Sequence, residues 1–183
     1  MKKFFKFGCL GFIGLIVLII VIAMFSGDGD EPVSTGTDSG STEKAKSDDK
    51  PIDDGSKKVD ASDQSTDAAG LIVALGEVKI SSDKIQVGIN VENTTENKLS
   101  FYPDQGSAVI GDIQLDANMF LTDGDVSGEI QGGVKKEAVL EFLTPDGKEI
   151  DVNSIKEVKL MLGDVFNDTT FESKPVNFTI PIK

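Results

Sequence analysis

The sequence predicts an all-β fold for most of this chain: an antiparallel β-sandwich of about 7–8 strands, preceded by one transmembrane helix and a disordered linker. Three observations lead to this prediction. An uncharged apolar run occupies residues 7–27, an acidic low-complexity stretch follows over residues 28–69, and hydrophobic residues alternate with a period of two within residues 70–183. A chain of 183 residues has room for one ordinary domain beside these appendages.

The apolar run, Phe7 to Gly27, is long enough to span a membrane. As a helix it measures about 31 Å, which matches the hydrocarbon thickness of a bilayer. Three lysines precede the run within a cytoplasmic stub, residues 1–6, and acidic residues follow it. The positive-inside rule therefore predicts a single-pass protein of the cell membrane, with its N-terminus inside and its C-terminal domain extracellular.

The apolar run has two alternative interpretations. A cleaved signal peptide needs a small-residue cleavage site, and Val21-Ile22-Ala23 offers one, so cleavage after Ala23 stays an alternative to the retained signal anchor. A bacterial lipoprotein carries its modified cysteine after the apolar core, whereas Cys9 lies near the start of this run, so that alternative fails. Because Cys9 is the single cysteine, no intrachain disulfide can form.

The stretch of residues 28–69 predicts a disordered acidic linker. It holds twelve acidic residues against five lysines and hardly a large apolar side chain. Such a composition cannot bury enough surface to offset the entropy of ordering. As a coil of about 42 residues it has a root-mean-square span of roughly 35 Å. The linker is expected to hold the folded domain clear of the lipid headgroups.

The composition excludes several classes of function. The net charge is −13, and all 18 basic residues are lysines, so no nucleic-acid partner is expected. The absence of histidine removes His-based catalytic triads and metal ligands. Tryptophan is also absent, and with arginine missing the chain lacks two of the residues that dominate most protein–protein hot spots.

Within residues 70–183 the strand patterns follow one another at short spacing. Leu71 to Ile80 is a mostly apolar run and the first expected strand. Turns are expected at residues 93–97 and 144–147, and Met119-Phe120-Leu121 is expected to close one end of the core. The further strands are expected where apolar residues alternate, at Ile85, Val87, Ile89 and Val91, at Leu99 and Phe101, at Ile113 and Leu115, at Ala138, Leu140 and Phe142, at Val158, Leu160 and Leu162, and at Val176, Phe178 and Ile180.

Several of these segments resemble a known family. The matching stretches are residues 85–95 (IQVGINVENTT), 98–103 (KLSFYP), 112–118 (DIQLDAN), 128–133 (GEIQGG) and 176–180 (VNFTI). They are similar to an immunoglobulin-like extracellular domain of unknown function, found in membrane-anchored proteins and lipoproteins of Gram-positive bacteria. The resemblance covers most of residues 71–182 and implies an immunoglobulin-like sandwich on a Gram-positive cell surface. It implies no catalytic residue, and this chain has no lipobox.

The loop Asp123-Gly-Asp125-Val-Ser127-Gly128-Glu129 is the candidate metal site. Side-chain oxygens at alternate positions with glycine at the sixth match the first half of a calcium loop. The second half does not match, because the twelfth position is Val134. Turn formation alone also explains the Asp and Gly residues. The sequence therefore predicts no cofactor, with calcium as the alternative. Tyr102, between Phe101 and Pro103, is a possible ligand contact.

The sequence thus predicts a non-catalytic membrane-anchored protein that presents an immunoglobulin-like domain on the cell surface for interaction with a protein or an envelope component. The alternative is a weak calcium- or small-ligand-binding extracellular domain that uses the loop of residues 123–129. An enzyme would have to rest on carboxylates, for example Glu129 with Glu137 or Asp123 acting as an acid–base pair. Such acidic residues on outward strand faces are normally just solvated. The oligomeric state and the identity of the partner do not follow from the sequence.

Overall fold

Period-two alternation and turn residues produce an almost entirely antiparallel β structure. The computed structural model describes residues 33–36 and 55–182. Its strands are β1 (Lys57–Asp60), β2 (Ser65–Ala68), β3 (Leu71–Ile80), β4 (Lys84–Asn93), β5 (Leu99–Phe101), β6 (Ser107–Ile110), β7 (Ile113–Ala117), β8 (Asp123–Gly124), β9 (Gly128–Ile130), β10 (Lys135–Leu143), β11 (Glu157–Asn167) and β12 (Ser173–Pro181). Within these ranges the one helical element is a single 3-10 turn, η1 (Pro103–Gln105).

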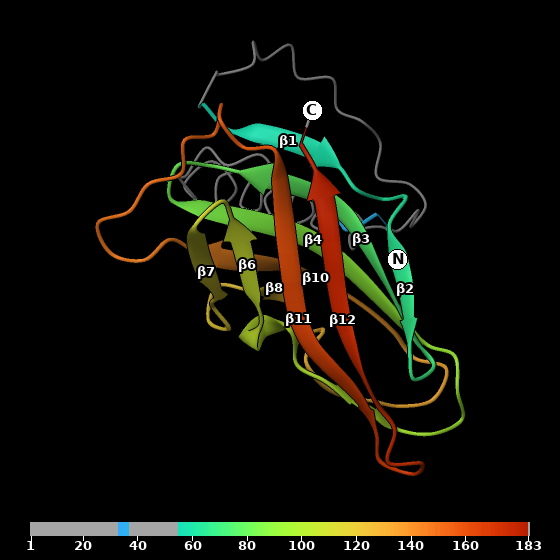
Figure 1. The fold of residues 1–183 in the computed structure, drawn as a ribbon. Coiled ribbons are helices and arrows are strands. Elements are labelled where there is room, and N and C mark those ends of the chain that lie inside the picture. The colour runs from blue at the N-terminus through green and yellow to red at the C-terminus, as the bar shows by residue number, and fades with distance from the viewer. Residues whose placement is uncertain (1–32, 37–54, 183) are drawn as a thin grey trace, which may run out of the picture. The chain divides into compact units, whose positions relative to one another are not determined.

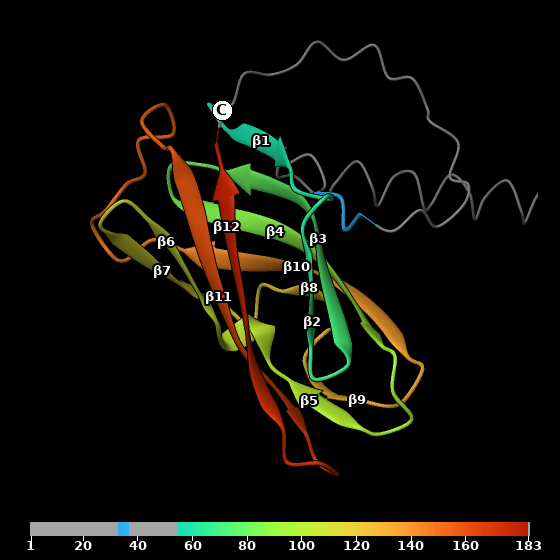
Figure 2. The ribbon, with the colours of Figure 1, turned by 45° about the vertical axis from the view of Figure 1, so that its right-hand side comes forward.

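The strands form one hydrogen-bonded sheet that folds over into two layers. The strand order is β1-β3-β4-β10-β7-β6-β11-β5-β9, and β2, β8 and β12 pair with β3, β10 and β11. In both ribbon views, β11 and β12 lie across the face of the layer that contains β3, β4 and β10 (Figures 1 and 2). The β6–β7 hairpin joins the layers, because β7 pairs with β10 and β6 pairs with β11. The architecture is therefore an all-β sandwich closed along one side.

The hydrophobic core lies between the two layers. Alternate residues of β11 and β12 are buried, as in a strand with one face on the core and the other in water. The largest fully buried aromatic side chains are Phe101 and Phe142, from β5 and β10. The sequence predicted both as inward-facing residues of alternating strands, and this prediction is confirmed.

Most of the predicted strands are present close to the expected positions. The runs beginning at Leu71 and Ile85 are β3 and β4, and the alternating segments around Phe101, Leu115, Leu140, Leu160 and Phe178 are β5, β7, β10, β11 and β12. The predicted turn at residues 144–147 is closed by Lys148 N, which donates to Pro145 O at 3.0 Å.

The predicted linker contains two strands that the sequence did not indicate. β1 and β2 both pair with the same edge of β3, β1 against residues 77–80 and β2 against residues 71–74. Ala61 and Ala68 are fully buried members of the core. The assignment of residues 57–68 to a disordered linker is therefore wrong. Their side chains alternate weakly, and the exposed backbone edge of β3 supplies the hydrogen bonds that order them.

A second correction concerns Met119-Phe120-Leu121, which was expected to close the core. All three side chains are exposed, and Phe120 is 89% exposed on the loop between β7 and β8. The core is closed elsewhere by residues such as Val126, Ile150 and Ile155. The short strands β6, β8 and β9 were also not predicted.

The predicted cytoplasmic stub and transmembrane anchor, residues 1–6 and 7–27, lie outside the described residues, as do residues 28–32 and 37–54 of the predicted linker. In the part of the chain that the structure describes, no helix is long and apolar enough to span a membrane.

A candidate binding groove beside the β6–β7 turn

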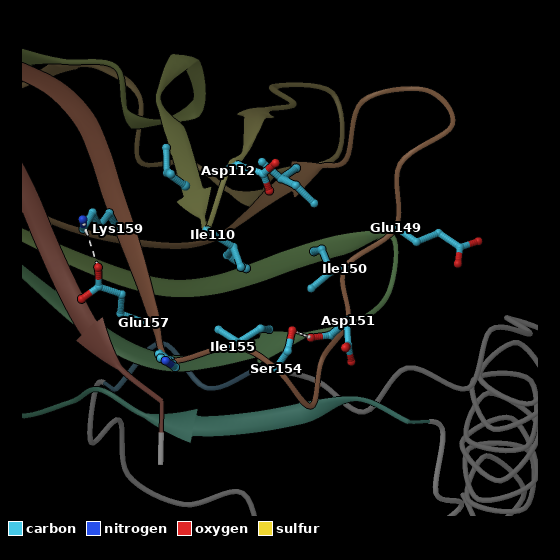
Figure 3. Close-up of a pocket in the computed structure, with 13 residues that line it drawn as sticks. Ile110, Asp112, Glu149, Ile150, Asp151, Ser154, Ile155, Glu157 and Lys159 are labelled. Carbon is cyan, nitrogen blue, oxygen red and sulfur yellow. Dashed lines mark hydrogen bonds and ion pairs between the residues drawn. The ribbon is translucent and has the colours of Figure 1, made fainter.

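A groove of about 640 Å³ lies where the β6–β7 turn faces the segment that leads into β11. One wall is formed by residues 109–113, and the other by residues 149–157 with Lys159 (Figure 3). The turn is tight, with Ile110 opposite Ile113 and only Gly111 and Asp112 between them. Gly111 has a φ of +58°, a conformation that glycine adopts without steric cost.

The floor of the groove is apolar. Ile110, Ile150 and Ile155 are buried in the core cluster, and the half-buried Ile113 packs against that cluster. Their edges line the groove from opposite walls, as Figure 3 shows for the three buried residues. The floor therefore offers hydrophobic contact that is continuous with the core.

The rim of the groove is charged and mainly acidic. It carries Asp112, Glu149, Asp151 and Glu157 against two lysines, Lys156 and Lys159. Lys159 Nζ lies 3.0 Å from Glu157 Oε1, so this lysine and this carboxylate partly neutralise each other (Figure 3). The remaining rim charges have an acidic excess.

Backbone hydrogen bonds hold the wall of residues 149–157 in place. Ile150 N donates to Ser82 O at 2.7 Å, which ties the wall to the turn between β3 and β4. Ser154 N and Ser154 Oγ both donate to Asp151 O, each at 3.0 Å. Ile182 N donates to Lys156 O at 2.8 Å. Because the wall is fixed at both ends, the groove is preformed.

The four predicted metal ligands lie in different surroundings. Asp123 belongs to β8, which pairs with β10. Asp125 Oδ2 forms an ion pair with Lys136 Nζ at 3.2 Å. Ser127 Oγ is buried without a hydrogen-bond partner among the described residues. Glu129, in β9, accepts from Lys98 at 2.6 Å. No group of three acidic side chains able to hold a metal ion occurs within residues 33–36 and 55–182. Calcium binding by this loop stays a prediction without geometric support.

Lys98 is the centre of a small charge cluster instead. Its Nζ lies 2.6 Å from Glu129 Oε1 and 3.3 Å from Asp168 Oδ2, which joins β5 to β9 and to the β11–β12 turn. The hydrogen bond to Glu129, with a smaller contribution from Asp168, raises the pKa of Lys98 above its ordinary value. Exposure to solvent limits what such a pair adds to stability.

Two of the carboxylates that could form an acid–base pair also have separate partners. Glu129 is paired with Lys98, whereas Glu137 Oε2 accepts a hydrogen bond from Thr35 Oγ1 at 3.0 Å. Tyr102 is half exposed beside the buried Phe101, so it is accessible to a ligand; contact with a ligand stays a prediction.

The sequence analysis missed the residues of the groove. A signal was present in Ile110-Gly-Asp-Ile113, which has the form of a two-residue hairpin turn between apolar residues. The other wall lies in a loop, where no period identifies which apolar residues point inward.

No protein-family model matches the chain, and no curated protein matches it in sequence. Among solved structures, a functionally unknown protein from Listeria monocytogenes EGD-e aligns with a TM-score of 0.50 and 16% identity, over 69% of this chain and 86% of that chain. The yeast GGA1 GAE domain aligns with a TM-score of 0.34 and 12% identity, over 64% of this chain and 96% of that chain. The chain therefore shares its overall fold with the Listeria protein.

Proposed function

We propose that this chain is a non-catalytic, membrane-anchored cell-surface protein whose immunoglobulin-like sandwich binds a partner in the extracellular envelope. The observation that carries the binding role is the preformed groove beside the β6–β7 turn, with its apolar floor and acidic rim. A concave site with apolar contacts and a few polar groups is the usual form of a binding site.

The chemistry of the groove selects the kind of partner. Isoleucine side chains on the floor favour an apolar side chain, and the acidic excess on the rim favours lysine or arginine beside it. A volume of about 640 Å³ holds a few side chains. The partner that fits best is therefore a short protein segment in which apolar and basic residues are neighbours.

The placement of the domain outside the cell is supported by the sequence of residues 1–31, in which lysines precede an uncharged apolar run and acidic residues follow it. Labelling on intact cells tests this placement. In a Cys9→Ser background, Ser154→Cys puts one thiol on the exposed wall of the groove. A membrane-impermeant maleimide is expected to label it without lysis, and labelling only after lysis would refute the surface location.

The binding role is tested by photo-crosslinking from the groove. A photoreactive amino acid at position 154 of the full-length protein is expected to capture a discrete partner on cells, and the same probe at position 174, on β12, is not. Asp112→Lys together with Glu149→Lys, which reverses part of the rim charge, is expected to abolish the capture. Equal capture from both positions, or capture unaffected by charge reversal, would contradict the proposal.

A further inference from the structure

Residues 33–36, near the start of the predicted linker, lie against the outer face of the layer formed by β3, β4 and β10. We call these four residues the docked segment. Val33 is only 9% exposed, although the sequence around it is polar. Glu77 N, in β3, donates to Ser34 O at 2.8 Å. The backbone of the segment is thus bonded directly to β3.

Two glycines make room for the docked segment. Gly76 and Gly88 lie on the neighbouring strands β3 and β4, where the register shifts between Leu75 and Val78. A β-carbon on either glycine would overlap with Ser34 O, and one on Gly76 would also come within 2.7 Å of Gly36 N. Backbone atoms cannot move aside as a flexible side chain can, so these positions admit only glycine while the segment is docked.

Polar side chains of the same sheet face fix the register of the segment. Asn90 Nδ2 donates to Thr35 O at 2.9 Å, and Thr35 Oγ1 donates to Glu137 Oε2 at 3.0 Å. Asn90 and Glu137 are paired across β4 and β10, two register positions from the pair Gly88 and Val139 and on the same face of the sheet. The glycines and these two side chains therefore form one site across three strands, which we call the glycine seat.

We propose that the glycine seat is a binding site for an extended peptide segment and that its resident ligand is Val33–Gly36 of the same chain. It uses the features expected of such a site: close backbone approach, hydrogen bonds to main-chain groups and a buried apolar side chain. Gly36, with a φ of +83°, lets the chain turn at the end of the docked segment.

Docking of the segment limits how far the domain can lie from the membrane surface. This step rests on the proposed membrane anchor. Five residues, 28–32, separate the end of the predicted transmembrane helix from Val33. A fully extended chain of this length covers only about 20 Å. Without docking, the stretch between the predicted helix and β1 is residues 28–56. As a coil of about 29 residues it has a root-mean-square span of roughly 30 Å and a much longer maximum. Docking therefore holds the domain close to the membrane surface, and release of the segment lengthens the tether.

Crosslinking of the full chain in detergent tests the seat. In a Cys9→Ser background, Thr35→Cys with Glu137→Cys places two thiols where the wild-type side chains are hydrogen-bonded. A short bis-maleimide is expected to join them at least about tenfold faster than it joins Thr35→Cys with Lys174→Cys, on β12, because docking raises the effective concentration of the first pair. Equal rates for the two pairs would overturn the proposal.

Variants on each side of the contact keep this test decisive. Gly88→Val is expected to reduce the fast rate to that of the control pair. Val33→Asp is expected to do the same. Because Val33 lies outside the strands of the sandwich, this variant provides the test if Gly88→Val fails to fold. Ala45→Asp adds the same charge outside the docked segment and is expected to leave the rate unchanged. A fast rate that persists in the Val33→Asp variant would contradict the seat.

The short tether has its own measurement. The full chain is reconstituted in vesicles of phosphatidylcholine and phosphatidylglycerol, with a donor dye on Ser154→Cys and an acceptor dye on the lipid. Val33→Asp is expected to lower the energy transfer. Unchanged transfer, with the crosslink lost, would refute the short tether and leave the seat intact. A chain that does not enter vesicles would refute the membrane anchor instead, and the crosslinking result in detergent would still stand.

Discussion

Lys98 Nζ lies 2.6 Å from Glu129 Oε1, and this ion pair occupies the carboxylate that would otherwise be the last ligand of the predicted calcium loop. Asp125, at the third position of the loop, is paired with Lys136 at 3.2 Å. A calcium ion would have to displace both lysines. The arrangement favours a structural role for these acidic residues, in which they link neighbouring strands and the loops beside them.

The first prediction concerns calcium. Millimolar calcium is expected to produce no saturable heat in calorimetry and no specific rise in Tm, because two of the three carboxylates of the loop, those of Asp125 and Glu129, are paired with lysines. Magnesium at the same ionic strength is the control for screening. A saturable rise in Tm with calcium alone, lost in an Asp123→Asn variant, would restore the loop of residues 123–129 as a cation site.

The second prediction is a pH dependence at the alkaline end. The pKa of Lys98 is raised above its ordinary value of 10.5, mainly by the hydrogen bond to Glu129. The folded state therefore holds this proton more tightly than the unfolded state does. The stabilisation is fully present below the unfolded pKa and is lost as the pH rises through the raised folded value. Lys98→Met is expected to make Tm less dependent on pH in that range.

Asp60 gives the opposite sign at the acidic end. Hydrogen bonds from Ser62, first from its side chain and then from its backbone, lower the pKa of Asp60 below 3.8. Its contribution to stability is present above that value and is lost as the pH falls through the lowered pKa. Asp60→Asn is expected to flatten the acid limb of the Tm profile slightly, and an unchanged limb would contradict the assignment to this residue.

The third prediction concerns Asn93, a fully buried polar side chain at the end of β4. Its Nδ2 donates to Asn97 O and Ile130 O at 2.8 and 2.9 Å, and its Oδ1 accepts from Thr95 N at 3.0 Å. Asn93→Asp replaces the two donated bonds by repulsion between oxygens. The free energy of unfolding is expected to fall by about 2–3 kcal/mol in chemical denaturation.

The exposed Asn153 provides the matched control for Asn93. Asn153→Asp makes the same chemical change on the surface and is expected to alter the free energy of unfolding by less than about 0.5 kcal/mol. Equal effects at the two positions would show that the buried hydrogen bonds of Asn93 contribute little.

The fourth prediction tests the exposed loop of residues 119–121. Phe120→Ser is expected to change the free energy of unfolding by less than about 0.5 kcal/mol, because the ring is 89% exposed. Phe142→Ala, in the core, is expected to cost about 3–5 kcal/mol. A large loss of stability in Phe120→Ser would show that this ring does close the core, as the sequence suggested.

The fifth prediction measures the groove directly with a defined probe, a heptapeptide of alternating lysine and leucine. Binding is expected to weaken with added salt, because the rim is acidic and exposed. Glu149→Lys is expected to weaken binding by roughly tenfold. The control is Asp146→Lys, which adds the same charge on the turn that precedes the groove without lining it. Equal weakening of peptide binding in both variants would show that the effect comes from the net charge of the protein and not from the groove.

The sequence by itself determined the strands with one face in the core. Along β4, β11 and β12 the side-chain period is two, so each alternating apolar residue identifies the buried face without any knowledge of the partner strand. The turn at residues 144–147 was predictable for a similarly local reason, since its proline and glycine restrict the backbone. The apolar run of residues 7–27 is likewise a property of one continuous segment.

The tertiary structure decided everything that depends on residues distant in the chain. β1 and β2 exist because β3 offers a free edge, and the docked segment lies on its sheet because Gly76 and Gly88 are neighbours there. The groove forms only where the β6–β7 turn meets a loop some forty residues further on. Met119 to Leu121 are exposed for the complementary reason, since apolar side chains become core only where another layer covers them. The local period of the sequence indicates which face of a strand is apolar. Only the pairing of strands determines which part of the protein covers that face.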